Sequence, residues 1–264
     1  GLTELQVQFQ KEAILMLIRH YTKEAGVRDL ERVIASILRK IVKNLLLNKE
    51  IAFYEVDVVL VEKLLGKKKY HYMEKENDQN IGLVNGMAYT VFGGDILPIE
   101  ATYYKGTGNL ILTGSLGEVM KESAHIAFSY VKSRAEEFDI DSHILNENDI
   151  HIHVPEGAVN KEGPSAGITL TTTLISLFKQ APVDSTIAMT GEITLRGKIL
   201  PIGGLKEKLI GAHRSGIKEV YLPLENEPDL DDVPKEIIND LTIHLVTDYE
   251  EIYEQLFNKK EVRV

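Results

Sequence analysis

The amino-acid sequence predicts an α/β (α+β) domain with a mixed sheet, preceded by a small all-α subdomain. Apolar residues recur at helical spacing through the first part of the chain, whereas strand-like and helix-like segments alternate after Ile81. Between these parts, residues 66–80 are rich in Lys, Glu, Asn and Asp and poor in aliphatic residues, as domain boundaries often are. We therefore expect a helical subdomain at residues 1–70, a linker at 71–80 and the α/β domain at 81–264.

The helical subdomain is predicted from three amphipathic segments. The first has apolar residues at i, i+3, i+4 and i+7 from Ile14, and Gly26 is suited to cap its C-terminus. The second spans Arg28–Leu47 and carries a broad apolar stripe. The third and shortest spans Val56–Leu65.

The α/β domain is predicted from the alternation of short strand-like runs with longer helical ones. We expect strands at residues 81–91, 95–103, 110–113, 150–154, 186–189, 195–200, 220–223 and 242–246. We expect helices at residues 117–138, 168–178, 205–213 and 249–257. The turn residues Arg196-Gly197 suggest hairpin neighbours, which favours a mixed sheet over a purely parallel one.

Composition excludes several classes of protein. A length of 264 residues with 44% hydrophobic and 27% charged residues is ordinary for a soluble globular chain. A net charge of −10 argues against a dominant nucleic-acid surface, and we interpret the short basic run Lys67–Lys69 as a solvated linker. The sequence has no apolar run of the ~18 to 20 residues that span a bilayer and no signal-peptide pattern, so we expect a cytoplasmic protein without membrane contact. Without cysteine, the chain has no disulfide, thiol nucleophile or thiolate metal site.

The segment Gly163–Gly167, with the sequence G-P-S-A-G, suggests a serine placed to react. It follows a strand-like run and precedes a helix, so the positive end of the helix dipole would point at Ser165. The flanking glycines leave room for a substrate, and backbone N–H groups near Ser165 and Ala166 could hold the oxyanion of an attacked carbonyl. The same residues also suit an ordinary helix start, because Ser and Pro are common there.

One candidate base for this serine is a histidine. The segment matches the G-x-S-x-G elbow of α/β-hydrolases, and Asp231 or Asp232 followed by His244 satisfies the order of their acid and histidine. Two features oppose this interpretation. Eight residues, Glu156–Gly163, separate the strand from Pro164, whereas an elbow follows its strand directly. His244 also lies inside an alternating strand, where a structural or exposed histidine is commoner.

The other candidate base is a lysine in the segment Pro201–Ile210, where a glycine pair opens a short helix. Lys208 lies beside the apolar stripe of this helix and Lys206 on its other flank, so periodicity alone does not choose between them. Either lysine could instead be an ordinary one with its ammonium group in water. A lysine base must be neutral near pH 7, which requires burial to lower a pKa of ~10.4 by about 2 to 3 units.

Four ordered motifs resemble the C-terminal part of the Lon family of ATP-dependent serine proteases, along nearly the whole chain. They are P-E-G-A at residues 155–158, G-P-S-A-G at 163–167, T-G-E-I-T-L-R-G at 190–197 and P-I-G-G-L-K-E-K at 201–208. The resemblance implies that Ser165 is the nucleophile and Lys208 the base, in a Ser-Lys dyad that needs neither histidine nor cofactor. It implies a serine endopeptidase that hydrolyses unfolded or damaged proteins in quality control and the stress response.

The same resemblance assigns supporting residues around the dyad. It places Thr190 near the lysine amine, and it places Glu162, where the family usually has aspartate, three residues before the nucleophile. His151 and His153 share one face of their strand and could in principle ligate zinc. Because the chain lacks cysteine and a metalloprotease pattern of carboxylates, we predict no metal there. We expect instead a packed, hydrogen-bonded face near the active site, to which Glu100 also contributes.

The N-terminal helices resemble the small α-helical subdomain that closes the ATPase module of these proteins, with Gly26–Arg32 as its sensor-2 segment. Arg28 would then reach the nucleotide phosphates, unless it is an ordinary surface arginine. The sequence contains no G-x-x-x-x-G-K-[ST] phosphate loop, so we expect ATP and Mg²⁺ to serve the full-length protein and not to bind this chain alone. We expect a piece of a larger machine. The resemblance implies a hexameric ring acting on polypeptides, although a piece without its ATPase core could be monomeric.

Two further classes of function stay open from the sequence. Residues 163–166 faintly resemble the Gly-Ser-Ser-Ala phosphate loop of some small-molecule kinases, although Pro164 removes one amide donor. A catalytically inactive assembly module is the other alternative, which the presence of both dyad residues disfavours.

Overall fold

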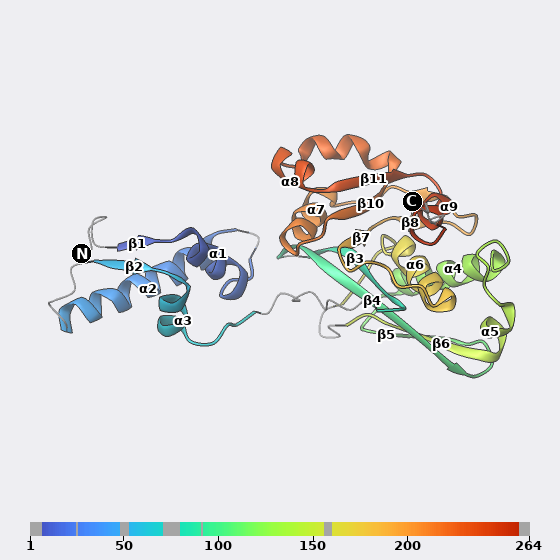
Figure 1. Cartoon of the computed structure of the whole chain (residues 1–264), viewed down its shortest axis with the longest axis horizontal. Helices are drawn as coiled ribbons and strands as arrows, with labels where there is room; N and C mark the ends of the chain where they lie inside the picture. The colour runs from blue at the N-terminus through green and yellow to red at the C-terminus, as the bar shows by residue number, and fades with distance from the viewer. Residues whose placement is uncertain are drawn as a thin grey trace, which may run out of the picture. The chain divides into compact units, whose positions relative to one another are not determined.

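The computed structural model of the chain describes residues 7–24, 26–47, 53–70, 80–90, 92–155 and 160–258. Its backbone forms two compact units, one within residues 1–74 and 91–93 and the other within residues 75–90 and 94–264 (Figure 1). Most of the predicted linker, residues 71–79, and all but the proline of the P-E-G-A motif lie outside the described residues.

The first unit is a small helical domain with a short parallel ladder. Its helices are α1 (Lys11–His20), α2 (Arg28–Leu47) and α3 (Val58–Leu65), and β1 (Val7–Phe9) pairs in parallel with β2 (Tyr54–Val56). The apolar stripes of the helices meet in a core that includes Ala13, Leu17, Tyr21, Ile37, Ile41 and Val61. The three predicted helices are present. The two strands were not predicted, because three residues are too few to show a period.

Carboxylates cap two of these helices. At the start of α3, Asp57 accepts a hydrogen bond of 2.7 Å from the N–H of Leu60. At the start of α2, Glu24 accepts from the N–H groups of Asp29 and Leu30, both at 2.9 Å. These bonds satisfy donors that a helix start leaves unpaired, and the bond from Asp29 is the main reason that the pKa of Glu24 is lowered.

The second unit is built on a seven-stranded sheet with the order β11-β10-β7-β3-β4-β6-β5 (Figure 1). The strands are β3 (Leu83–Thr90), β4 (Gly93–Lys105), β5 (Leu110–Thr113), β6 (Asn148–His153), β7 (Ile187–Met189), β10 (Glu219–Pro223) and β11 (Thr242–Val246). Strands β3, β7, β10 and β11 pair in parallel, β5 is parallel to β6, and β4 is antiparallel to β6. The predicted fold class, an α/β domain with a mixed sheet, is confirmed.

Helices cover both faces of this sheet at β7. The three residues of β7 are buried, and because side chains alternate along a strand, Ile187 and Met189 belong to one apolar cluster and Ala188 to another. The first cluster contains residues of α4 (Glu118–Ser133), α6 (Gly167–Lys179) and α9 (Tyr249–Leu256). The second contains residues of α7 (Leu205–Arg214), with α8 (Lys235–Asp240) packed against it. The helices α6 and α7 thus lie on opposite faces of the sheet.

The predicted strand at residues 195–200 is wrong. The structure has a small hairpin instead, in which β8 (Glu192–Ile193) pairs antiparallel with β9 (Ile199–Leu200). The tight turn between them uses Gly197 at φ +88, and the Thr194 side chain accepts from the N–H of Lys198. The turn was predicted from Arg196-Gly197, but the strand was placed across it. Three short elements were not predicted, namely α5 (Ser142–Glu147), the 3₁₀ segment η1 (Leu224–Asp232) and α8.

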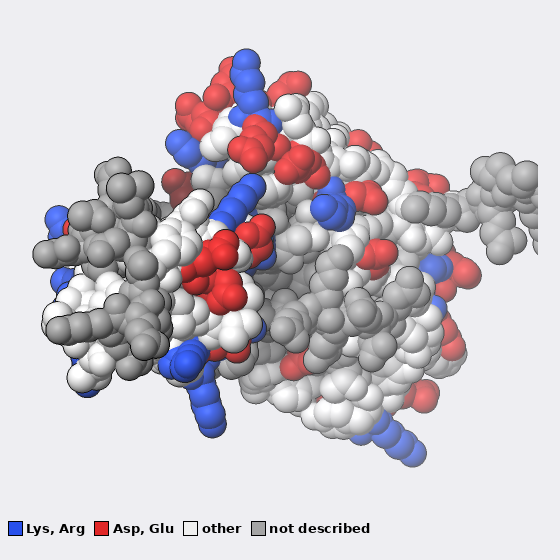
Figure 2. Space-filling model, turned by 60° about the vertical axis from the view of Figure 1, so that its left-hand side comes forward, with Lys and Arg blue, Asp and Glu red and all other residues white. Residues whose placement is uncertain are grey.

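The surface mixes charges of both signs. On the face shown in Figure 2, basic and acidic side chains are interspersed. In the basic run Lys67–Lys69 the side chains of Lys67 and Lys69 are exposed. The backbone there is tied to the end of α1, because the N–H groups of Lys69 and Tyr70 donate to the carbonyl of His20 at 2.9 and 3.1 Å. Among the described residues, no helix combines the length and apolar character needed to cross a bilayer.

The central position of α6 in the core can be tested by truncating one side chain. Leu174 lies within α6 and is fully buried, so Leu174→Ala should lower the free energy of unfolding by about 2 to 5 kcal/mol through lost burial and a cavity. Chemical denaturation followed by circular dichroism measures this change. The control Leu195→Ala, at a side chain that is 61% exposed, should stay within about 0.5 kcal/mol of the parent. Equal losses in both variants would contradict the assigned core.

Candidate active site

Ser165 lies at the start of a helix that the core holds rigidly. The turn that contains Ser165 uses Gly163 at φ +98, and helix α6 begins at Gly167, two residues after Ser165. The carbonyl of Ser165 accepts the N–H of Gly191 at 2.8 Å, and the carbonyl of Gly191 accepts the N–H of Ile168 at 3.1 Å. A side chain at Gly167 would come within 2.7 Å of the backbone of Ile193, so the turn packs directly on the hairpin β8–β9. These contacts fix the backbone on both sides of the serine.

Lys208 reaches Ser165 from α7. Lys208 is only 3% exposed. Its Nζ lies 3.0 Å from the Oγ of Ser165 and 3.0 Å from the Oγ1 of Thr190. Burial lowers the pKa of the Lys208 amine to about 8, because charge is disfavoured away from water. Lys206, in contrast, is exposed. The structure thus separates the two lysines that helical periodicity left equivalent.

Thr190 connects the amine back to the serine. It is fully buried, follows the last residue of β7, and its hydroxyl donates to the carbonyl of Ser165 at 3.0 Å. Because a hydroxyl has one hydrogen, Thr190 can only accept from the amine of Lys208. A neutral amine has two N–H groups and one lone pair. Donating one N–H to Thr190 leaves the lone pair available to the Ser165 hydroxyl.

The three side chains meet at the carboxyl end of β7. Ser165 comes from the turn before α6 on one face of the sheet, Lys208 comes from α7 on the other, and Thr190 directly follows β7 between them. Sites in open α/β sheets form at such strand ends, where connections leave for opposite faces. In the sequence, Thr190 lies 25 positions and Lys208 lies 43 positions from Ser165. The order of the strands, rather than local structure, brings the three residues together.

Two backbone donors lie beside the serine oxygen. The N–H groups of Ser165 and Ala166 make no hydrogen bond to other described residues, and both precede the first turn of α6. The helix dipole adds positive potential at this end. The pair can therefore donate hydrogen bonds to a negatively charged oxygen that forms next to Ser165.

Glu162 contacts a helix start and not the dyad. Its Oε1 accepts from the N–H of Val119, in the first turn of α4, at 3.1 Å and from the N–H of Gly163 at 3.3 Å. Gly117 supplies the space, since a side chain there would overlap the carboxylate of Glu162. The α4 N-cap, Gly117, has no side chain, so Glu162 supplies an acceptor that this helix start otherwise lacks.

His151 and His153 share one hydroxyl partner. The Oγ1 of Thr113 on β5 lies 2.9 Å from the Nε2 of His151 and 2.7 Å from the Nδ1 of His153. Glu100 on β4 stands opposite His153 in the antiparallel register and is exposed. Within the described part of the chain, no group of three or more metal-binding side chains occurs. The two histidines are therefore engaged with a threonine on the neighbouring strand.

The histidine triad considered from the sequence is not assembled. The Nε2 of His244 lies 3.1 Å from the carboxylate of Glu219, and its ring stacks on Tyr221 at 4.5 Å between centroids. His244 thus pairs with neighbours on the adjacent strand β10 and not with Asp231 or Asp232. The elbow interpretation is wrong because a strand histidine finds its partners across the sheet.

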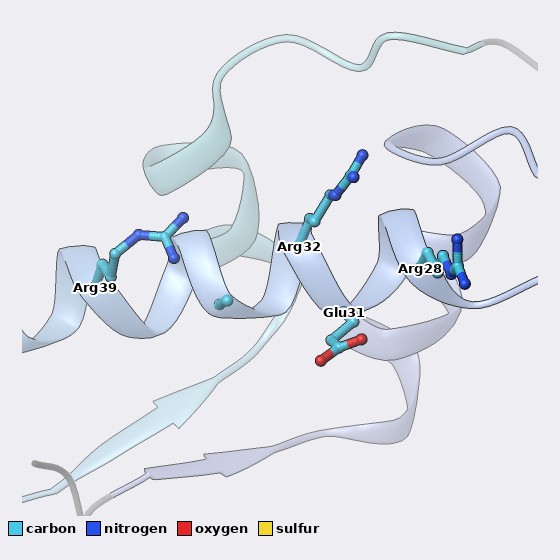
Figure 3. A pocket seen from close by; sticks show the side chains of 5 residues that line it. Arg28, Glu31, Arg32 and Arg39 are labelled. Atoms are coloured by element: carbon cyan, nitrogen blue, oxygen red, sulfur yellow. The ribbon is translucent and has the colours of Figure 1, made fainter.

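Arg28 lies in the first unit, at the start of α2, where it lines a shallow pocket. The other lining residues are Glu31, Arg32, Ala35 and Arg39. Figure 3 shows the guanidinium groups of Arg32 and Arg39 rising from the same side of the helix. Three guanidinium groups and one carboxylate give this pocket a net positive charge, which suits a phosphate-bearing ligand.

One residue that supports the site was missed from the sequence. Asn226, in η1, is 3% exposed and holds the loop before α7 by accepting the N–H of Ile202 and donating to its carbonyl, each at 2.9 Å. It also donates to Asp229. Asn226 lies within an acidic, irregular stretch, and no periodic pattern marks a residue whose partner is 24 positions away.

The geometry defines a class of protein before any comparison. A serine hydroxyl 3.0 Å from a buried amine of lowered pKa, beside free backbone donors, is the arrangement of a Ser-Lys hydrolase. Residues 55–259 match the family model of the Lon protease (S16) C-terminal proteolytic domain, and residues 1–53 match that of the Lon protease AAA+ ATPase lid domain. The chain belongs to the Lon protease family, as the motifs predicted.

Relatives named Lon protease occur in several bacteria. The chain is 54% identical over 256 residues to that of Mycoplasma mycoides, 52% identical over 256 residues to that of Bacillus thuringiensis and 50% identical over 257 residues to that of Aster yellows witches'-broom phytoplasma. The alignments cover 96–97% of this chain and 32% of each relative. The chain therefore spans about a third of the length of the curated relatives it matches.

Serine-dependent hydrolysis should rise with pH between about 7 and 9. A lysine base acts in its neutral form, and with a pKa of about 8 roughly a tenth of the Lys208 amine is neutral at pH 7 and about nine tenths at pH 9. Measuring kcat/KM on a short peptide from pH 6 to 10 tests this. An acid limb centred near pH ~6.5 would point to a histidine base instead.

Replacing the lysine by methionine should stabilise the fold while removing its chemistry. Below pH 8 the amine is protonated in the folded and the unfolded chain, so burial penalises only the folded state. Between about 8 and 10.5 the unfolded chain binds more protons, and the penalty fades as the pH rises. Lys208→Met should raise the free energy of unfolding by on the order of 3 kcal/mol at pH 7. Denaturation at several pH values measures the gain, and a gain that does not shrink above pH ~10 would refute this reasoning.

Proposed function

We propose that this chain is the proteolytic part of an ATP-dependent serine endopeptidase, and that Ser165 and Lys208 cleave peptide bonds as a dyad. The observation that carries the proposal is the 3.0 Å approach of the Lys208 amine to the Ser165 hydroxyl, at a site where the amine is 3% exposed and its pKa is lowered to about 8. The family membership supports the same chemistry.

In the proposed reaction, neutral Lys208 takes the proton of Ser165 as the serine oxygen attacks a peptide carbonyl. Thr190 holds the amine by accepting one of its N–H groups, which directs the lone pair at the serine. The N–H groups of Ser165 and Ala166 stabilise the oxyanion. The lysine then gives its proton to the leaving amine, and water hydrolyses the acyl-enzyme by the same route.

Supporting roles follow from the contacts. We propose that Glu162 keeps the serine turn in place by joining Gly163 to the start of α4. His151, His153 and Glu100 belong, in this proposal, to a polar surface beside the substrate path, because they lie together on the antiparallel pair β4–β6. They do not enter the proton transfer.

The substrates and partners are part of the proposal. We propose that the full-length protein acts on unfolded or damaged polypeptides in the cytoplasm, as a homohexamer, with residues 1–70 as the lid of its ATPase module, 71–80 as a linker and 81–264 as the protease. The match of residues 1–53 to a lid domain supports the assignment of the first part of the chain to the lid. ATP with Mg²⁺ would supply the energy of substrate unfolding. The cationic pocket at Arg28 fits the nucleotide phosphates, which would also need groups outside this chain.

Variants of the two lysines test the dyad. Lys208→Ala, Lys208→Gln and Lys208→Arg should each lower kcat for a short peptide by roughly 10³-fold or more, because none leaves an amine that can become neutral in place. Lys206→Ala, at an exposed lysine on the same helix, is the matched control and should keep most of the activity. The reverse result would move the base to Lys206.

Active-site labelling tests the nucleophile. A serine-directed fluorophosphonate should form one covalent adduct on Ser165, located by mass spectrometry of the digested chain, and Lys208→Gln should slow the labelling in parallel with peptide cleavage. Adduct formation at another serine, with Ser165 unmodified, would overturn the assignment.

A further inference from the structure

The first residues of β4 lie directly against the backbone of α7, the helix that carries Lys208. A side chain at Gly94 would overlap the carbonyl of Glu207 and come within 3.0 Å of the backbone nitrogen of Lys208. A side chain at Gly211 would lie 2.6 Å from the carbonyl oxygen of Gly94 and 2.7 Å from the nitrogen of Asp95. Strand and helix therefore approach to a distance that only glycine at both positions permits.

A third residue ties the same two segments together. The Nη2 of Arg214, in the last turn of α7, donates to the carbonyl of Gly94 at 2.7 Å and lies 4.0 Å from the carboxylate of Asp95. Positions 207, 211 and 214 are four and three residues apart, so they lie on one side of the helix. The contact with β4 thus runs along α7 from beside Lys208 to its last turn.

The position of Lys208 depends on this contact. Its backbone is part of the contact with Gly94, while its amine ends 3.0 Å from Ser165, which other elements hold in place. Because a short helix moves largely as a unit, any withdrawal of α7 from β4 moves the amine relative to the serine. It would also admit water to an amine whose pKa is lowered by burial.

We propose that Gly94 and Gly211 are positioning residues for the general base, whose direct backbone contact sets the distance between the Lys208 amine and Ser165. This inference rests on the proposed Ser-Lys mechanism and adds to it the structural element that places the base. Neither glycine touches the substrate or the reacting atoms.

Helix propensity and the contact make opposite predictions for one substitution. Gly211 lies inside α7, where the intrinsic helix propensity of alanine is higher than that of glycine, so propensity alone predicts that Gly211→Ala stabilises the chain. The contact predicts that the added methyl group pushes α7 away from β4 by roughly 1 Å, to restore a normal separation of about 3.5 Å. A shift of that size in a catalytic group costs about 100-fold in rate.

The experiment compares Gly211→Ala with Gly203→Ala in the 264-residue chain. At Gly203 an added side chain meets nothing within 4 Å, so this variant is the matched control. We expect Gly211→Ala to lower kcat for a short peptide by about 100-fold with little change in KM. We also expect the acid limb of its kcat profile to move to higher pH, towards the ordinary lysine range, because the amine becomes hydrated. Gly203→Ala should keep the parental kcat and profile.

Other outcomes would overturn the inference. If Gly211→Ala keeps the parental rate, or loses activity equally at every pH in step with lost thermal stability, the contact is structural only. If Gly211→Ala does not fold, Arg214→Met tests the proposal instead, because it removes the hydrogen bond to Gly94 without adding an atom at the contact. If the acid limb of the kcat profile of Arg214→Met stays at the parental pH, the proposal is refuted. Parental activity that does not depend on Lys208 would refute the dyad itself, which is a distinct result.

Discussion

The site depends on keeping one lysine amine out of water. Burial makes the protonated amine of Lys208 less favourable than it is in water, and folding must therefore supply the free energy that holds it there. On the same helix, Leu205 and Leu209 belong to a buried apolar cluster, and the amine has two hydroxyl partners. Among the residues that the structure describes, no carboxylate forms a hydrogen bond or ion pair with it. A carboxylate there would raise the pKa and keep the amine protonated. Hydroxyl partners leave it able to accept a proton.

The other contacts of the site are mainly between backbones, which explains the small residues around it. Gly167 packs on Ile193, Gly191 bonds to the carbonyl of Ser165, and Gly94 and Gly211 bring β4 onto α7. Backbone atoms in contact have less conformational freedom than long side chains. Such contacts therefore fix the distance between a hydrogen-bond donor and its acceptor to within a fraction of an ångström. A base that works over a single hydrogen bond needs that accuracy.

The sequence predicted those features that depend on local pattern. The helices at 28–47 and 168–178 have enough turns to show their period, and Ser165 could be singled out from its own neighbours. Lys208 could not be separated from Lys206 by periodicity, because burial of the amine comes from a sheet and a serine distant in sequence; the family motif was needed to choose. The hairpin at β8–β9 was misplaced, since two-residue strands carry no period. Asn226 binds the backbone of Ile202 and Glu162 that of Val119, and no local sequence pattern predicts such distant partners.

The groups that carry the proposed chemistry all belong to the second unit. Ser165, Lys208 and Thr190, with the backbone donors of Ser165 and Ala166, come from residues 165–208, and the hydrogen bonds found for them among the described residues are made within the second unit. Peptide hydrolysis by such a dyad is downhill and consumes no nucleotide. Under the proposed function, ATP is therefore needed to bring a folded polypeptide to the serine as an extended chain, and not for breaking the bond. A short peptide needs no unfolding, which makes it the substrate that reports on the dyad alone.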